Sequence, residues 1–140
     1  MTKRGNLLSD SASGYLAGLL DGEGCISLRG NIAFSRPCIE MVMTTPAPLF
    51  WAAKVTGCGN VYICKERRGN RRQPWRWVVT SIDEIKRIIN AVQLHLKVKW
   101  AEAQVLRVFA TLRVGVRKFG PRVSPETEGR LQRLSTLMKL

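Results

Sequence analysis

A glycine recurs every four residues near the start of this 140-residue chain, at Gly14, Gly18 and Gly22. Residues four apart lie on the same face of a helix, so this spacing predicts a helix with one face almost free of side chains. Each glycine inside a helix costs about 1 kcal/mol relative to alanine, so a row of them indicates a compensating contact. A second helix packed directly against this face would provide that contact, because small residues let two backbones approach closely.

The same stretch ends in two carboxylates. Asp21 and Glu23 alternate with Gly22 and Gly24 where the helix is expected to stop. Negative charge is unfavourable at a helix C-terminus, because the last carbonyl groups already carry partial negative charge. A bound cation would make these carboxylates favourable, so the end of this helix is a candidate metal site.

Residues 16–24, Leu-Ala-Gly-Leu-Leu-Asp-Gly-Glu-Gly, resemble the signature of the LAGLIDADG homing endonucleases. Six positions match the letters of that signature: Leu16, Ala17, Gly18, Leu19, Asp21 and Gly24. Leu20 is a conservative variant, and Glu23 keeps the carboxylate. The resemblance implies the α+β fold of that family, αββαββα, with a four-stranded antiparallel DNA-binding sheet and helices on its other face.

The hydrophobic pattern predicts the same order of elements. Period-two alternation predicts strands at about 26–31 and 38–44 that form one hairpin, and strands at 61–63 and 75–80 that form a second. Between the hairpins, Thr44, Thr45 and Pro46 predict the start of a short helix that ends before Gly57. A capping-box pattern from Ser81 to Glu84 predicts the start of the next helix.

The C-terminal part of the chain is predicted to be helical. A helix is expected from about 99 to 114. Its buried face is expected to carry Ala101, Val105, Val108 and Leu112. We expect residues 1–140 to form one LAGLIDADG-type endonuclease domain, in which a basic linker at about 115–123 leads to a C-terminal helix from Ser124.

Charge indicates the class of partner. The chain has 23 basic and 10 acidic residues, a net charge of +13, which favours a polyanion such as nucleic acid over other partners. Membrane-surface binding ranks second, because no predicted helix combines a basic face with an aromatic apolar face. The start of the chain lacks the apolar core of a signal peptide, and no apolar run approaches a membrane span. We therefore expect a soluble intracellular protein, in a bacterial or phage cytoplasm or an organelle.

The four cysteines do not predict a metal site. Cys25, Cys38, Cys58 and Cys64 show no C-x-x-C spacing, and His95 is the one histidine in the chain. A zinc site would be expected to show paired ligands at short spacing. Reduced thiols are the expected state.

The signature occurs once in this chain. In the family that it resembles, proteins with two signatures are single chains of double length, whereas proteins with one are homodimers paired through the signature helices. The resemblance and the glycine face therefore both imply a homodimer. The residues expected at its interface are Gly14, Tyr15, Ala17, Gly18 and Gly22.

The resemblance also implies a metal-dependent phosphodiester hydrolysis. Mg²⁺ usually takes one or two protein carboxylates and completes its shell with phosphate oxygens and water. By resemblance the metal-binding acid is Glu23, assisted by the carbonyl of Gly22, while Asp21 is expected to be structural. Mn²⁺ is expected to substitute for Mg²⁺, and Ca²⁺ to support binding without cleavage.

Three further residues are candidates for the catalytic site. Lys97 matches a basic residue that in the family lies near the scissile phosphate, with Lys99 as the alternative. A solvated basic face before a helix explains both lysines almost equally well. Thr45 stands where relatives often have a glutamine, and it either organises water or caps the following helix.

DNA is expected to lie on the polar face of the strands and against the basic hairpin loop. Arg29 and Asn31 could make bidentate contacts to guanine and adenine, and Glu40 could accept a hydrogen bond from cytosine. The other expected DNA contacts are Ser27, Arg36, Lys65, Arg67, Arg68, Arg71, Arg72 and Arg76. The loop residues among them are expected mainly to contact phosphates.

These features together predict a homodimeric, Mg²⁺-dependent homing endonuclease. The resemblance implies that it cuts both strands of a long, near-palindromic site across the minor groove and leaves short 3′ overhangs. Two alternatives on the same fold remain, an intron maturase whose partner is intron RNA and a catalytically silent DNA-binding regulator. Retention of Glu23 disfavours the silent regulator but not the maturase.

Overall fold

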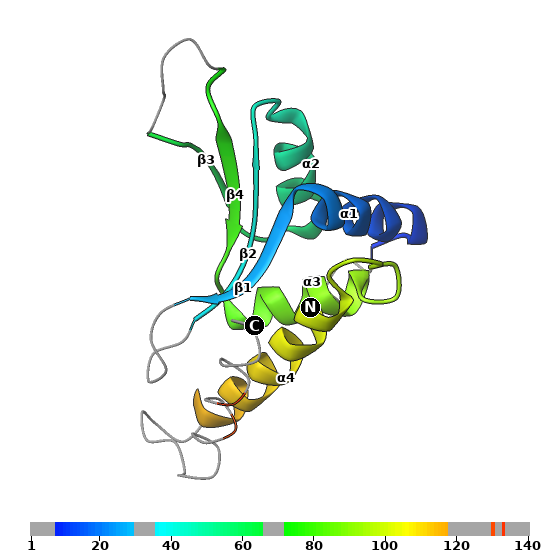
Figure 1. Cartoon of the computed structure of the whole chain (residues 1–140), viewed down its shortest axis with the longest axis vertical. Helices are drawn as coiled ribbons and strands as arrows, with labels where there is room; N and C mark the ends of the chain where they lie inside the picture. The colour runs from blue at the N-terminus through cyan, green and yellow to red at the C-terminus, as the bar shows by residue number, and fades with distance from the viewer. Residues whose placement is uncertain (1–7, 30–35, 66–71, 118–129, 131–132, 134–140) are drawn as a thin grey trace, which may run out of the picture.

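The structure is a computed structural model that describes residues 8–29, 36–65, 72–117, 130 and 133. Its elements, in chain order, are α1 (Asp10–Glu23), β1 (Gly24–Arg29), β2 (Arg36–Met43), α2 (Ala47–Thr56), β3 (Asn60–Ile63), β4 (Trp75–Val79), α3 (Ile82–Val92) and α4 (Trp100–Arg117) (Figure 1). This order confirms the predicted α+β class. No helix in these ranges is long and apolar enough to cross a membrane.

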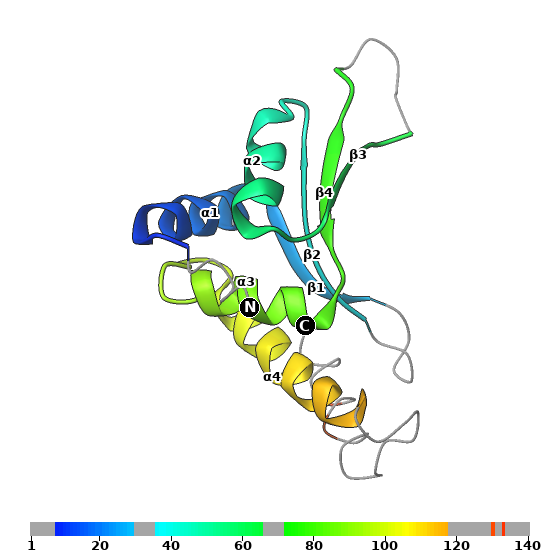
Figure 2. The ribbon, with the colours of Figure 1, turned by 180° about the vertical axis from the view of Figure 1, so that it is seen from behind.

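The four strands form one antiparallel sheet in the order β1-β2-β4-β3. Each predicted hairpin is present, and the two hairpins join where β2 pairs with β4 in the middle of the sheet. Seen from either side, the described helices lie on one side of the sheet (Figures 1 and 2). None of the described helices covers the other face of the sheet, as the resemblance implies.

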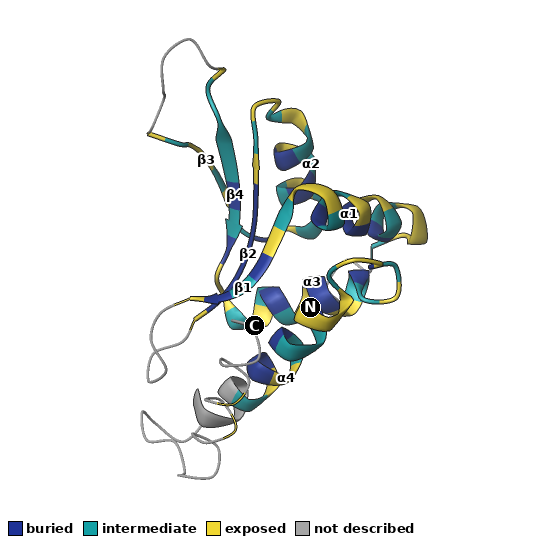
Figure 3. Cartoon of the chain, in the orientation of Figure 1, coloured by how far each residue is buried: buried dark blue, intermediate teal, exposed yellow. Residues whose placement is uncertain are grey.

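Alternation along the strands decides which face is buried. Ile26 pairs with Ile39, which pairs with Val79, and all three side chains are buried in the core beneath the helices (Figure 3). Trp77 is completely buried on the same side. Because side chains alternate between faces, the intervening residues, Arg29 among them, lie on the open face. This confirms the predicted parity of the strands.

The predicted apolar face of α4 is only partly buried. Ala101 is exposed and Val108 is 41% exposed, whereas Leu112 packs against the edge of the core. The residues that are buried are Ala103, Leu106, Phe109 and Ala110. Apolar residues occur on more than one side of this helix, so periodicity alone did not fix its rotation. The rotation of α4 is fixed instead by its packing against α3 and the sheet.

The side-chain caps predicted for α2 and α3 do not form. The N-cap residue of α2 is Pro46, without a side-chain hydrogen bond, so neither Thr44 nor Thr45 caps that helix. Ser81 is the N-cap of α3 but makes no cap bond. The Glu84 side chain instead accepts a hydrogen bond from the backbone N–H of Gly59 at 3.0 Å. A tertiary contact has therefore replaced the local capping box.

The turn at Gly59 depends on glycine. Gly59 has φ +75°, and a Cβ there would lie 2.6 Å from the carbonyl oxygen of Val78. The turn therefore needs glycine and brings the backbone against β4. There the Trp77 indole N–H donates to the carbonyl of Cys58 at 3.0 Å.

The C-terminal boundary differs from the prediction. Helix α4 continues to Arg117, so residues 115–117 are helical and do not belong to a linker. The rest of the predicted linker and almost all of the predicted C-terminal helix lie outside the described residues.

Candidate nucleic-acid interface and carboxylate site

The carboxylate site is built by an abrupt change from helix to strand. Gly24 ends α1, where its backbone N–H donates to the carbonyl of Leu20, and it is also the first residue of β1. A Cβ at Gly24 would lie 2.8 Å from the Cα of Leu20, so this junction needs glycine. The last helical residue, Glu23, is exposed at the junction.

The other carboxylate of the signature faces its own fold, as predicted. Asp21 accepts hydrogen bonds from the backbone N–H groups of Lys97 at 2.8 Å, Val98 at 3.1 Å and Lys99 at 3.0 Å. These residues directly precede α4, so Asp21 holds the start of that helix against the end of α1. The sequence suggested a structural role for Asp21 but gave no sign of this partner, which lies more than 70 residues away.

These contacts change the acidity of Asp21. Partial burial opposes ionisation of its carboxyl group, but the three backbone N–H groups and the nearby Lys99 charge together lower its pKa below the ordinary value. The group is therefore an anion at neutral pH. An ionised acceptor makes the stronger kind of hydrogen bond to the backbone.

The two candidate lysines lie beside this site but differ in their surroundings. The Lys99 ammonium donates to the carbonyl oxygen of Asp21 at 2.7 Å, so it offsets negative charge at the C-terminus of α1. Lys97 is exposed, and its backbone is fixed to Asp21. The backbone of Lys97 is thus held against the end of α1, while its side chain lies at the surface.

Thr45 lies at the same end of the sheet. Gly24 pairs with Met41, so β2 runs past the α1–β1 junction and ends at Met43. Thr45 follows two residues later, exposed, and makes no cap bond to α2. The structure therefore removes the plain N-cap as an explanation of this residue.

The residues at this site fit a cation with few protein ligands. Within the described ranges, no group of three or more histidine, cysteine, aspartate or glutamate side chains could hold a metal ion by itself. One exposed carboxylate, Glu23, and the adjacent Gly22 carbonyl match the low demand of Mg²⁺ for protein ligands. A metal at this site would need further ligands from phosphate, water or a second chain.

The glycine face of α1 is partly open. Gly18 and Gly22 are exposed, and a Cβ added at either would meet nothing within 4 Å. A Cβ at Gly14 would lie 3.9 Å from His95, so this glycine faces its own chain. Tyr15 is 54% exposed and meets Trp51 of α2 edge to face, with ring centroids 4.8 Å apart.

One predicted interface residue was wrong. Ala17 is completely buried in the core of its own chain, so it is unavailable to a partner. It lies next to Gly18 in sequence but about 100° around the helix, which turns it inward.

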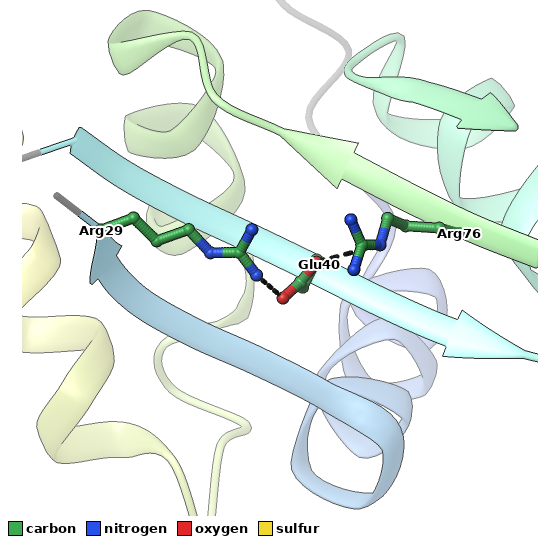
Figure 4. Close-up of polar contacts among 3 residues, drawn as sticks. All are labelled: Arg29, Glu40 and Arg76. Carbon is green, nitrogen blue, oxygen red and sulfur yellow. Dashed lines mark hydrogen bonds and ion pairs between the residues drawn. The ribbon is translucent and has the colours of Figure 1, made fainter. Parts of the chain in front are cut away.

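The open face of the sheet carries a three-residue charge cluster that the sequence did not predict. Glu40 on β2 makes an ion pair with Arg29 on β1 and another, 3.3 Å long, with Arg76 on β4 (Figure 4). Glu40 is only 7% exposed, so its predicted role as a free acceptor for cytosine was wrong. The sequence could have predicted this cluster from opposite charges at positions that share one face of adjacent strands.

Other predicted DNA-binding residues lie around this cluster. Arg36 is exposed and pairs with Arg29 in the β1–β2 register. Ser27 lies on the same face but is half-buried. Lys65 and Arg72, at the two ends of the basic loop, are exposed. Four predicted contacts lie outside the described residues: Asn31, Arg67, Arg68 and Arg71.

Comparison with solved structures decides the fold. I-CvuI, a homing endonuclease solved in complex with its target in the presence of Ca, superposes with a TM-score of 0.72 at 17% identity, over 93% of this chain and 81% of that chain. The archaeal intron-encoded homing endonuclease I-Vdi141I, complexed with DNA, gives 0.74 at 18% identity, over 93% and 83%. The chain has the LAGLIDADG homing endonuclease fold.

Longer LAGLIDADG proteins match this chain over part of their length. The meganuclease I-SmaMI, bound to uncleavable DNA, gives a TM-score of 0.68 at 19% identity, and this chain covers 43% of it. Comparison of the sequence with protein-family models and with curated proteins finds no match. The signature at residues 16–24 and the LAGLIDADG fold therefore agree, although overall identity is low.

Proposed function

We propose that this chain is a site-specific DNA endonuclease that works as a homodimer on double-stranded DNA. The observation that carries the proposal is the contact between Asp21 and residues 97–99. It holds the backbone of Lys97 against the end of the signature helix, two residues before Glu23, which directly precedes the sheet. The structures of I-CvuI, I-Vdi141I and I-SmaMI in complex with DNA support DNA as the proposed substrate.

The proposed chemistry divides the work among a few side chains. Glu23, with the Gly22 carbonyl, would hold a divalent cation, Mg²⁺ or Mn²⁺. When bound there, the cation would supply Lewis-acid stabilisation of charge on the phosphodiester oxygens. Lys97 would neutralise the scissile phosphate, while Thr45 would orient water at the same end of the sheet. Lys99 would act through Asp21, by keeping α1 and α4 together.

DNA would lie along the open face of the sheet. Arg29 and Arg76 present guanidinium groups there, and Arg36 adds a third near the end of the β1–β2 hairpin. Arginine suits this role because its fork of donors matches both the guanine edge and phosphate oxygens. Ser27 and the basic loop from Lys65 to Arg72 would extend the contact along the groove.

A second copy of the chain would complete the site. The bare backbone at Gly18 and Gly22 allows a partner helix to approach closely, with Tyr15 at the edge of the contact. Two copies would bring two Glu23 side chains to the symmetry axis, one for each strand of DNA. A symmetric dimer would read a near-palindromic site and cut it across the minor groove, leaving short 3′ overhangs. Each copy would act as one endonuclease domain.

The DNA that flanks the reading frame provides the test. Homing predicts that the two flanks, fused without the intervening element, form the cleavage site. Purified protein and Mg²⁺ should cut this fused duplex at one position and leave the unfused flanks intact. Binding without cleavage in Mg²⁺ or Mn²⁺ would instead identify a silent regulator. Binding to the intron transcript, without binding to the duplex, would identify a maturase.

A further inference from the structure

The face of the sheet that is proposed to bind DNA carries a carboxylate, Glu40, between two arginines. A carboxylate that faces a polyanion is unfavourable, because its charge repels the phosphates. Glu40 is nevertheless the central charge of the open face, between arginines on the strands to either side (Figure 4). Its side chain is 10% exposed, whereas those of Arg29 and Arg76 are 49% and 36% exposed. The carboxylate is thus covered, and the two guanidinium groups form the surface.

The geometry leaves donors of both arginines available. Arg29 contacts Glu40 through Nη2 and Arg76 contacts it through Nε, so the ion pair of Arg76 does not use its Nη atoms. The 3.3 Å contact of Arg76 is an ion pair without hydrogen-bond geometry, so Nε and Oε2 have no hydrogen-bond partner among the described residues. A guanidinium group has five N–H donors, and a bidentate contact to guanine needs two.

Holding these side chains in place has an energetic consequence. A free arginine side chain must lose rotamer freedom when it docks against a base. Arg29 and Arg76 have lost part of this freedom already, because Glu40 restrains both. Restraint before binding favours a contact in one orientation and disfavours the many orientations that reach a phosphate.

We propose that Glu40 is a positioning residue for sequence specificity, which orients Arg29 and Arg76 to read two guanines of the target. The proposal rests on the proposed function, since it concerns DNA that the sheet binds. Glu40 itself contacts no base in this account. It lowers affinity for DNA in general and raises discrimination at two base pairs of each half-site.

The experiment selects bound duplexes from a randomised library with the wild type, Arg29→Ala, Arg76→Ala, Glu40→Gln and Glu40→Asp. The two arginine variants identify the base pairs that each arginine reads. Glu40→Gln should lose about fivefold or more of the preference at those same base pairs. It should also bind unrelated DNA more tightly, with a steeper dependence on salt, because the released arginines can contact phosphates. Glu40→Asp keeps the charge but is too short to reach both arginines, so it should lose preference at one or both positions.

Two controls separate positioning from stability and from net charge. Asp83→Asn removes the same charge from an exposed position on α3, and it should leave base preference unchanged. Nuclear magnetic resonance of the arginine side chains, without DNA, should show slow rotation of the Arg29 and Arg76 guanidinium groups in the wild type and fast rotation in Glu40→Gln. Circular dichroism shows whether each variant is folded.

Several results would overturn the inference. Fast rotation in the wild type would show that Glu40 does not hold the arginines. A folded Glu40→Gln or Glu40→Asp with reduced stability and wild-type base preference would reduce Glu40 to a structural residue. Arginine variants without any change in preference would show that neither arginine reads a base, while leaving DNA binding intact. A wild type that selects no duplex would refute the proposed function itself and this inference with it.

Discussion

Lys99 binds Asp21 twice, although the two residues are 78 positions apart in the sequence: its backbone N–H donates to the carboxylate at 3.0 Å, and its ammonium group donates to the carbonyl oxygen at 2.7 Å. This pair connects the end of the signature helix to the start of α4. Glu23 lies two residues after Asp21 and Lys97 lies two residues before Lys99, so this pair joins the two segments that carry them.

The first prediction concerns the stability that this contact provides. Asp21→Ala removes the acceptor of three backbone N–H groups, so it should lower the free energy of unfolding by about 1–2 kcal/mol. Urea denaturation followed by circular dichroism measures the change. Glu23→Gln is the matched control on the same helix end, and it should leave stability unchanged or raise it by about 0.5 kcal/mol. Equal losses in both variants would contradict the division of roles.

The second prediction concerns pH. The folded state lowers the pKa of Asp21, so the unfolded chain binds the proton more readily and ionised Asp21 contributes stability. The difference in unfolding free energy between wild type and Asp21→Asn should be complete above about pH 5. It should shrink as the pH falls below about 4, through the lowered pKa of the folded state. A difference that grows on acidification would have the wrong sign.

How far the sequence predicts this structure depends on the range of each interaction. Period-two alternation predicted the strands correctly, because one face of the sheet is buried, as at Ile26 and Ile39, and the described helices leave the other uncovered. The nine-residue signature placed Glu23 at the helix end. Both are local patterns, so a single sequence contains them.

The errors arose where distant parts of the chain meet. The capping box at Ser81 and Glu84 is locally sound, but Gly59 takes the Glu84 carboxylate. Glu40 was interpreted as a free acceptor, because its sequence neighbours do not include Arg76. The apolar faces of α4 were ambiguous until packing selected Leu106 over Val108. Each of these outcomes needed the strand register or the helix packing.

The third prediction tests assembly. A Cβ added at Gly18 meets nothing within 4 Å in the single chain, and Gly18 is exposed, so Gly18→Leu should fold normally. A leucine there would hold two signature helices apart, so the variant should be monomeric in light scattering at concentrations where the wild type is dimeric. Ala101→Leu adds apolar surface at an exposed position of α4 and should remain dimeric. A folded Gly18→Leu that dimerises with wild-type affinity would refute the proposed interface.

The fourth prediction concerns the basic loop. Arg72 is exposed at the C-terminal end of the loop, and we expect it to contact phosphate. Arg72→Ala should weaken binding similarly for all sequences and reduce the slope of log affinity against log salt by about 0.9. The same reduction is expected singly for alanine at Arg67, Arg68 and Arg71. An unchanged slope with altered base preference would show that the loop reads sequence.

The proposed cleavage depends most on Glu23. Glutamine has nearly the shape of glutamate but no charge, so Glu23→Gln should keep the fold and the DNA-binding sheet. It loses the anionic ligand that would hold the metal, and because both copies carry the change, neither strand should be cut.

The decisive measurement pairs a gel shift in Ca²⁺ with cleavage of the same duplex in Mg²⁺, for the wild type and for Glu23→Gln. We predict that Glu23→Gln binds as tightly as the wild type, or slightly tighter because a negative charge beside DNA is gone, and that cleavage falls below detection. Cleavage at the wild-type rate would contradict the catalytic role of Glu23. Loss of both binding and cleavage would show that Glu23 is structural and that the metal-binding acid lies elsewhere.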